Sequence, residues 1–125
     1  MTTQLAIKPT EHSTYKDLVE SLHTIYARDK HNAEKTISDV SLRLQECGRA
    51  GTCQMLGEIL ADDALLQEIA NRSYLHGNGF YKIILEENDI FRLRLHIWLP
   101  TSTAEENIHD HRWHFASTIL SGTVE

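Results

Sequence analysis

Hydrophobic positions near the start of the chain recur at helical spacing. Leu18, Leu22 and Ile25 stand at i, i+4 and i+7, a pattern that predicts an amphipathic helix from Thr14 onward. Thr14 is followed three positions later by Asp17, which is typical of a helix N-terminal cap. Residues 1–12 show no such period, so we predict that the first helix follows an extended arm.

Further helical patterns follow up to about residue 72. Asn32 is expected to cap a second helix, and Gly48 is expected to end it, since glycine is common directly after a helix. A third helix is expected from near Thr52, and the Asp62-Asp63 pair is expected to break it and to cap a short fourth one. We interpret the apolar stripe of each helix as core packing.

From about Ser73 the period shortens towards 2, the spacing of a strand. His76 to Gly79 is predicted as a turn, Phe80 to Leu85 as a strand, and Glu86 to Asp89 as a polar turn. A second strand is predicted over Ile90–Leu99, ended by Pro100. Its alternation places one apolar set and one polar or aromatic set on opposite faces: Phe91, Leu93, Leu95, Ile97 and Leu99 against Arg92, Arg94, His96 and Trp98.

Helices first and consecutive antiparallel strands afterwards predict an α+β fold in a single domain, 1–125. The helical part covers about 13–72, and the strands of an incomplete barrel cover about 80–125. The chain stops at Glu125, directly after a turn and inside what reads as a new strand. We therefore expect a chain truncated at its C-terminus, with further strands and site residues beyond Glu125.

Composition and charge narrow the partners. The formal net charge of −6 argues against a nucleic-acid partner and against an anionic membrane surface, because both attract clustered Lys and Arg. No leader and no apolar run long enough to span a bilayer is recognisable, so we expect a soluble, cytoplasmic protein without membrane association. Cys47 and Cys53 are expected to be reduced thiols.

Candidate chemistry gathers in Asn107–Gly122, which reads NIHDHRWHFASTILSG. Residues i and i+2 of a strand share one face about 7 Å apart, so His109 and His111 could close on one metal ion. A His-x-His pair on an exposed strand usually has no function. Here a third histidine, His114, follows it, and an acidic loop with Glu105 and Glu106 precedes it. We therefore predict a metal site.

The third ligand stays open between His114, His96, Glu106 and a residue beyond Glu125. Regular strand parity turns His114 away from the other two histidines, and a bulge at Arg112–Trp113 would bring it back. His96 could instead line the pocket and donate a hydrogen bond to a ligand. Asp110 is a candidate supporting partner, and Arg112 and Trp113 would flank the metal strand.

The segment Asn107–Gly122 resembles the first conserved motif of the cupin superfamily, a glycine-bounded strand pair that carries His-x-His. More narrowly, IHDH, a following histidine, an apolar strand and a glycine turn resemble the cysteine dioxygenase (thiol dioxygenase) family. The likeness extends upstream: Tyr15–Tyr26 is similar to the first helix of that family, and Phe80–Trp98 to the two strands before its metal motif.

The resemblance implies a ferrous iron, Fe(2+), held by three histidines, a small thiol or amino-acid substrate, and dioxygen that converts the thiol to a sulfinic acid. His109 and His111 match the first two iron ligands, and another divalent first-row metal could take the same site. Lys82 stands on the strand where the family carries a carboxylate-binding arginine; its plainer interpretation is a solvated lysine. Phe115 stands where some members carry a cysteine that crosslinks to tyrosine.

The predicted function is thus a metal-dependent cupin oxygenase similar to cysteine dioxygenase. Two alternatives are a cupin metalloenzyme of another class, since one fold hosts many chemistries, and a non-catalytic cupin-type binding domain. Bound iron with thiol-dependent oxygen uptake, bound iron without it, and no metal would separate the three.

Overall fold

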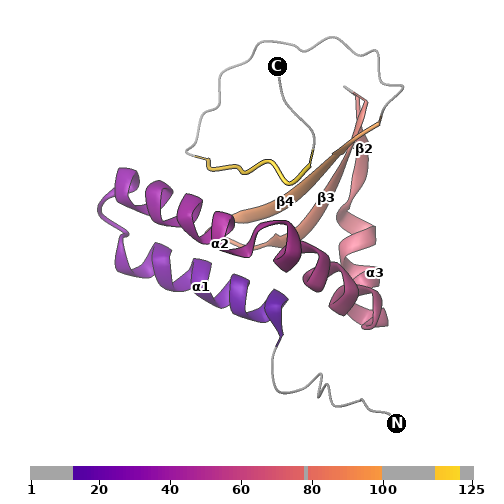
Figure 1. Cartoon of the computed structure of the whole chain (residues 1–125), viewed down its shortest axis with the longest axis horizontal. Coiled ribbons are helices and arrows are strands. Elements are labelled where there is room, and N and C mark those ends of the chain that lie inside the picture. The colour runs from indigo at the N-terminus through magenta and orange to yellow at the C-terminus, as the bar shows by residue number, and fades with distance from the viewer. Residues whose placement is uncertain (1–12, 78, 100–114, 122–125) are drawn as a thin grey trace. The chain divides into compact units, whose positions relative to one another are not determined.

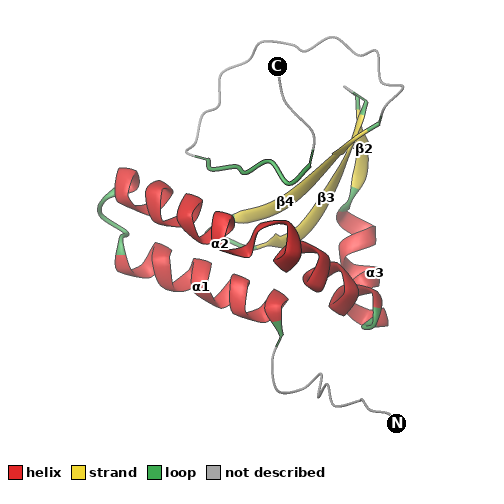
Figure 2. Cartoon of the chain, viewed as in Figure 1, coloured by secondary structure: helices red, strands yellow, loops and turns green. Residues whose placement is uncertain are grey.

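The computed structural model describes residues 13–77, 79–99 and 115–121. In these ranges three helices precede three strands, as Figures 1 and 2 show: α1 (Thr14–Arg28), α2 (Ala33–Leu60), α3 (Asp63–Arg72), β2 (Tyr74–His76), β3 (Phe80–Glu87) and β4 (Arg92–Trp98). This order confirms the predicted α+β class. The chain divides into a helical unit, residues 1–60 and 114–125, and a sheet unit, residues 61–113.

The first helix buries the stripe that its sequence predicts. Leu18, Leu22 and Ile25 are 1%, 2% and 7% exposed, and α1 packs against α2 within the helical unit. The predicted cap at Thr14 is wrong by one residue. Ser13 has extended backbone angles, φ −122° and ψ 115°, and its side chain accepts a hydrogen bond from the Lys16 N–H. A cap must have a non-helical backbone, and Thr14 already belongs to the helix.

A carboxylate from α2 completes the start of α1. Glu58 Oε2 accepts a hydrogen bond from the Thr14 N–H at 2.9 Å, and Oε1 accepts one from the Tyr15 N–H at 3.0 Å. The Ser13 hydroxyl also donates to Oε1, at 2.9 Å. The first N–H groups of a helix have no partner within the helix and carry a partial positive charge, so Glu58 satisfies and neutralises this end. These bonds join two segments more than forty residues apart.

Helix α2 is interrupted at Gly48. Asn32 caps its start as predicted, since Asn32 Oδ1 accepts a hydrogen bond from the Lys35 N–H at 3.0 Å. Gly48 has φ 56° and ψ −162°, angles that suit glycine and break the helix at the predicted place. Two helical halves of α2 therefore meet at Gly48, as predicted, but the second half resumes directly afterwards and not near Thr52. Glycine acts here as a kink within one long helical segment.

Charged side chains support the turn between α1 and α2. Asp29 is only 5% exposed, and its carboxylate pairs with Arg28, 3.1 Å between Oδ1 and Nε. Asp39 Oδ2 lies 2.8 Å from both Arg28 Nη2 and Lys35 Nζ. The pKa of Asp39 is lowered to about 2, and the hydrogen bond from Lys35 is the largest cause. The pairs of Asp39 therefore keep its carboxylate ionised at neutral pH.

In the sheet unit, Asp62 caps α3 as predicted, because its side chain accepts a hydrogen bond from the Leu65 N–H at 3.1 Å. Arg72, at the end of α3, donates from Nε to the Ile84 carbonyl at 2.9 Å and from Nη2 to the Leu85 carbonyl at 2.7 Å. Both carbonyls lie on β3 at its bulge, where the pairing with β4 shifts register. At the bulge, the Arg72 side chain therefore serves as a hydrogen-bond partner for these two carbonyls in place of a neighbouring strand.

The described strands form an antiparallel sheet in the order β2-β3-β4. Strand β2 was not predicted: His76 pairs with Phe80 across a turn in which Gly79 has φ 87°. Strand β3 extends two residues beyond the predicted end. Strand β4 begins at Arg92 because the Asn88 side chain stabilises the turn before it. The Oδ1 atom of Asn88 accepts hydrogen bonds from the N–H groups of Ile90 and Phe91. The alternation of β4 is confirmed. Closure into a barrel stays a prediction.

Cys47 and Cys53 are both free thiols, as predicted. Among the described helices, none combines the length and the apolar character needed to cross a bilayer.

Candidate functional site

The predicted metal ligands lie outside the described residues. This applies to His109, His111 and His114, and also to their predicted neighbours Asp110, Arg112 and Trp113. Within ranges 13–77, 79–99 and 115–121, no three His, Cys, Asp or Glu side chains come together as a metal-binding group. The metal site therefore stays a prediction from the sequence motif.

The two remaining candidates, Lys82 and His96, do come together. They are direct partners in the antiparallel pairing of β3 with β4. Tyr74 of β2 pairs with Lys82 from the other side, and Lys82 Nζ lies 5.4 Å from the centre of the Tyr74 ring. Directly paired residues share one face of a sheet, so these three side chains form one row across it. At this distance the ammonium group is attracted to the tyrosine ring.

The next row of the same face is aromatic. Phe80 lies at its centre, 6% exposed, between His76 of β2 and Trp98 of β4. The ring centres of Phe80 and His76 are 4.6 Å apart with planes at 16°, and those of Phe80 and Trp98 are 4.3 Å apart at 35°. The centre of the His96 ring lies 4.8 Å from the centre of the Phe80 ring. We call this surface the aromatic–cationic face: Tyr74, His76, Phe80, Lys82, Arg94, His96 and Trp98.

The electrostatics of the face favour a neutral His96. The residue is exposed as a whole, but its ring packs beside Phe80, and partial burial is the first cause that lowers the pKa of His96. The positive charges of Arg94 and Lys82 and the neighbouring His76 lower it further. An imidazole with a pKa below 6.5 is neutral at pH 7 and can accept a proton or a hydrogen bond.

In the part of the chain that the structure describes, the cations of this face have no carboxylate counterion. Among the described residues, neither Lys82 nor Arg94 forms an ion pair, whereas Arg92 at the other end of β4 pairs with Glu87 at 3.2 Å. An anion that approached Lys82 and Arg94 would therefore not have to displace a carboxylate from either. The arrangement can attract an anion and stack a flat group beside it.

The sequence pattern correctly predicts Lys82 on a strand and His96 and Trp98 on one face of the next strand, but it does not predict Tyr74 and His76 as part of the same face. It read the stretch before Gly79 as turn alone, because β2 is only three residues long. The available signal was the triplet Tyr74-Leu75-His76 in front of a glycine-rich turn, which alternates like the strand that follows.

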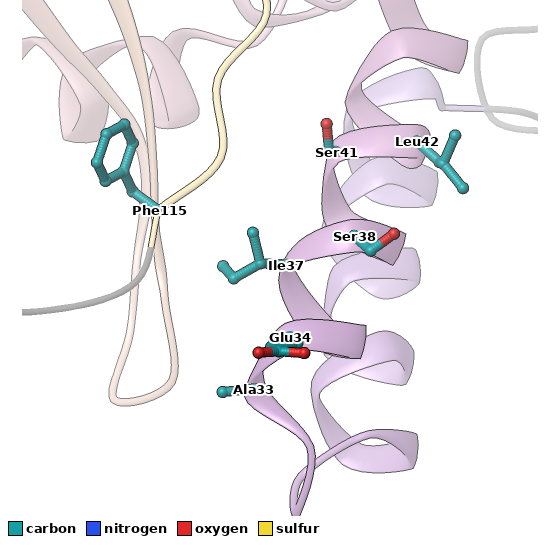
Figure 3. A pocket seen from close by; sticks show the side chains of 7 residues that line it. All are labelled: Ala33, Glu34, Ile37, Ser38, Ser41, Leu42 and Phe115. Atoms are coloured by element: carbon teal, nitrogen blue, oxygen red, sulfur yellow. The ribbon is translucent and has the colours of Figure 1, made fainter.

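The helical unit contains a separate hollow of about 530 Å³ beside the first half of α2. In Figure 3, Ile37 points from α2 towards the segment that carries Phe115. Glu34 is the one ionisable residue among the described residues that line it: Ala33, Glu34, Ile37, Ser38, Ser41, Leu42 and Phe115. A single carboxylate among mainly apolar and hydroxyl groups does not make a metal or acid–base site. The hollow is not a candidate active site.

Comparisons of the chain with models of protein families, with curated proteins and with solved structures find no significant match in any of the three. The functional assignment accordingly depends on the residues of this chain.

Proposed function

We propose that the protein is a metal-dependent cupin oxygenase similar to cysteine dioxygenase, which adds dioxygen to a small thiol at a histidine-bound ferrous iron. The observation that carries the proposal is the IHDH motif, His109 and His111, which follows a pair of antiparallel strands in sequence. The order of helices and then antiparallel strands is compatible with this proposal and supports it at the level of fold class.

The donor chemistry of the motif fits the proposed metal. Neutral imidazole binds first-row divalent ions, Fe(2+) among them, and two histidines on one strand face can bind with little loss of conformational freedom. His114 is one candidate for the third ligand, alongside His96, Glu106 and a residue beyond Glu125. When bound, the iron would supply a site at which a thiol and dioxygen meet in a fixed orientation.

The aromatic–cationic face suggests which residues would handle the rest of the substrate. Lys82 forms no ion pair with a described residue and could bind a substrate carboxylate, although as a point charge without the bidentate geometry of arginine. His96, its cross-strand partner, carries a lowered pKa and could donate or accept a hydrogen bond as a neutral imidazole. The aromatic rings beside them would exclude water from one side of such a pocket.

The test measures iron first and turnover second. The purified protein is loaded anaerobically with Fe(2+), bound iron is quantified, and oxygen uptake is followed with cysteine and with related thiols. His109→Ala and His111→Ala are each compared with His31→Ala, a matched control that replaces an exposed histidine in the turn between α1 and α2. We expect stoichiometric iron and thiol-dependent uptake in the unmodified protein and in the control, and loss of both in the two motif variants.

Each other outcome rejects part of the proposal. Iron without a response to thiols would favour a cupin metalloenzyme of another class. Iron that survives both motif substitutions would reject these ligands. Absence of iron altogether would leave a non-catalytic binding domain as the remaining interpretation.

A further inference from the structure

The aromatic–cationic face offers exposed rings to a flat ligand. Trp98 is 49% exposed although its ring centre lies 4.3 Å from Phe80, so one side of the indole rests on a buried ring and the other meets solvent. Tyr74, on the strand at the opposite edge, is also 49% exposed. A half-covered aromatic ring that is held in place by a packed neighbour is a ready stacking platform, because little side-chain freedom is lost on binding.

The same face is positively charged on a protein whose net charge is −6. Lys82 lies one row from Trp98, and Arg94 lies one row further along β4. Neither forms an ion pair among the described residues, and both act on His96 as positive charges that lower its pKa. A negatively charged group is therefore attracted to this face against the overall charge of the chain.

The geometry points to a ligand that carries a flat ring and an anionic group some distance apart, and we propose that the aromatic–cationic face binds a nucleoside monophosphate. The base would stack on the exposed side of Trp98, and the phosphate would pair with Lys82, within reach of Arg94. Neighbouring rows on one face of a sheet are about 7 Å apart. A ligand that contacts both Trp98 and Lys82 must therefore carry a spacer between its ring and its anionic group. The sugar of a nucleotide is such a spacer, and benzoate has none.

The same chemistry could come from a free nucleotide or from a nucleotide within a single strand of nucleic acid, and charge favours the free one. Binding of a strand is driven largely by many phosphate contacts. This face provides two cations that form no ion pair with a described residue, enough for one phosphate group, and the rest of the chain is net acidic. A strand would bring its further phosphates close to a protein of like charge.

This inference goes beyond the proposed oxygenase function and does not depend on it. It needs no metal and none of residues 107–114. The experiment is accordingly done on the full chain in the presence of a chelator, where failure of the metal site has no influence on the result.

Adenosine 5′-monophosphate is titrated into the protein by isothermal calorimetry, alongside adenosine, ribose 5-phosphate, benzoate and a short single-stranded oligodeoxynucleotide. We expect the nucleotide to bind about tenfold more tightly than adenosine or ribose 5-phosphate, since stacking and a charge-assisted hydrogen bond each contribute about one factor of ten. Binding of the nucleotide is also expected to weaken as salt is raised.

Two pairs of variants assign the binding to the face. Trp98→Leu is compared with Tyr81→Leu, an aromatic residue 42% exposed on the opposite face of the sheet. Lys82→Gln is compared with Lys30→Gln, which removes the same charge from an exposed position between α1 and α2. We expect each substitution on the face to weaken binding about tenfold and each control to leave it unchanged. Far-UV circular dichroism verifies that all four fold.

Four results would overturn the proposal: no binding of the nucleotide, adenosine bound as tightly as the nucleotide, equal losses in the controls and in the face variants, or an oligonucleotide bound more tightly than the free nucleotide. The last would reassign the face to single-stranded nucleic acid. The salt dependence of the unmodified chain tests the charged contact even if one of the variants does not fold.

Discussion

Glu58 should be one of the side chains on which the stability of the helical unit depends most. Its carboxylate accepts three hydrogen bonds from the start of α1, from the Ser13 hydroxyl and from the N–H groups of Thr14 and Tyr15, at 2.9 to 3.0 Å. Replacement by alanine leaves two helix N-terminal N–H groups without their protein acceptor. It also removes a negative charge from the positive end of the helix dipole.

The magnitude follows from the partners that are lost. A hydrogen bond to a charged group contributes about 1.5–3 kcal/mol and the capping of a helix start about 1 kcal/mol, but these effects are not additive. The site is only partly buried, so water replaces some of the lost partners. We expect Glu58→Ala to lower the free energy of unfolding by about 2 kcal/mol, and Glu58→Gln, which keeps one oxygen acceptor, by about half of that.

Urea unfolding at pH 7, followed by far-UV circular dichroism, measures the effect. Glu46→Ala is the matched control, because Glu46 is an exposed residue of the same helix with no hydrogen bond or ion pair in the described structure. Its effect should stay within about 0.5 kcal/mol. In a double-mutant cycle with Ser13→Ala, we expect a coupling energy of about 0.5–1 kcal/mol, since the two side chains are in direct contact.

The pH dependence provides a second readout. Partial burial acts to raise the pKa of Glu58, but the hydrogen bonds from Tyr15, Thr14 and Ser13 outweigh it, and the pKa is lowered. The unfolded chain then binds a proton more readily than the folded one, so the contribution of this ionisation is present above the unfolded pKa, about 4.3, and is lost as pH falls through the folded pKa. The difference in the free energy of unfolding between the unmodified protein and Glu58→Gln should therefore decrease below about pH 4. A variant as stable as the unmodified protein at pH 7, or a coupling energy of zero, would refute this account.

Other positions provide further tests by the same urea titration. Arg72→Met keeps the aliphatic stem but removes both hydrogen bonds to the Ile84 and Leu85 carbonyls. We expect the free energy of unfolding to fall by about 2 kcal/mol. An unchanged unfolding midpoint would contradict a structural role of Arg72 at the bulge. Gly48→Ala places a side chain at φ 56° and should lower the free energy of unfolding by about 1–2 kcal/mol. Gly57→Ala, at an open position of the same helix, should raise it by about 0.5–1 kcal/mol. The reverse order would exclude a kink at Gly48.

Much of the local structure could be predicted from residues close together in the sequence. The stripe of Leu18, Leu22 and Ile25, the caps at Asn32 and Asp62, and the alternation along β4 all depend on spacings of two to seven residues. A cap acts on its own first turn, and a strand face is determined by parity. The pattern predicts the cap of α1 one residue late because serine and threonine are both good caps, and only the backbone at Ser13 distinguishes them.

The candidate site was predictable only in part. Parity placed His96 and Trp98 on one face of β4, but it could not determine which residues of β3 stand opposite them. The pairing of Lys82 with His96, and the addition of Tyr74 from β2, depend on register, which is set by two turns and a bulge. For His109 and His111 the motif remains the basis of the prediction, since they lie outside the described residues.

The sequence alone determined where the three helices and the strands β3 and β4 occur to within a few residues, because these depend on contacts between near neighbours along the chain. Tertiary structure decided that Glu58 completes a helix more than forty residues earlier, and that rings and cations from three strands form one face. Such contacts depend on how separate elements pair and pack. No local pattern in a single chain carries that information, because the partner of each side chain lies far away in sequence.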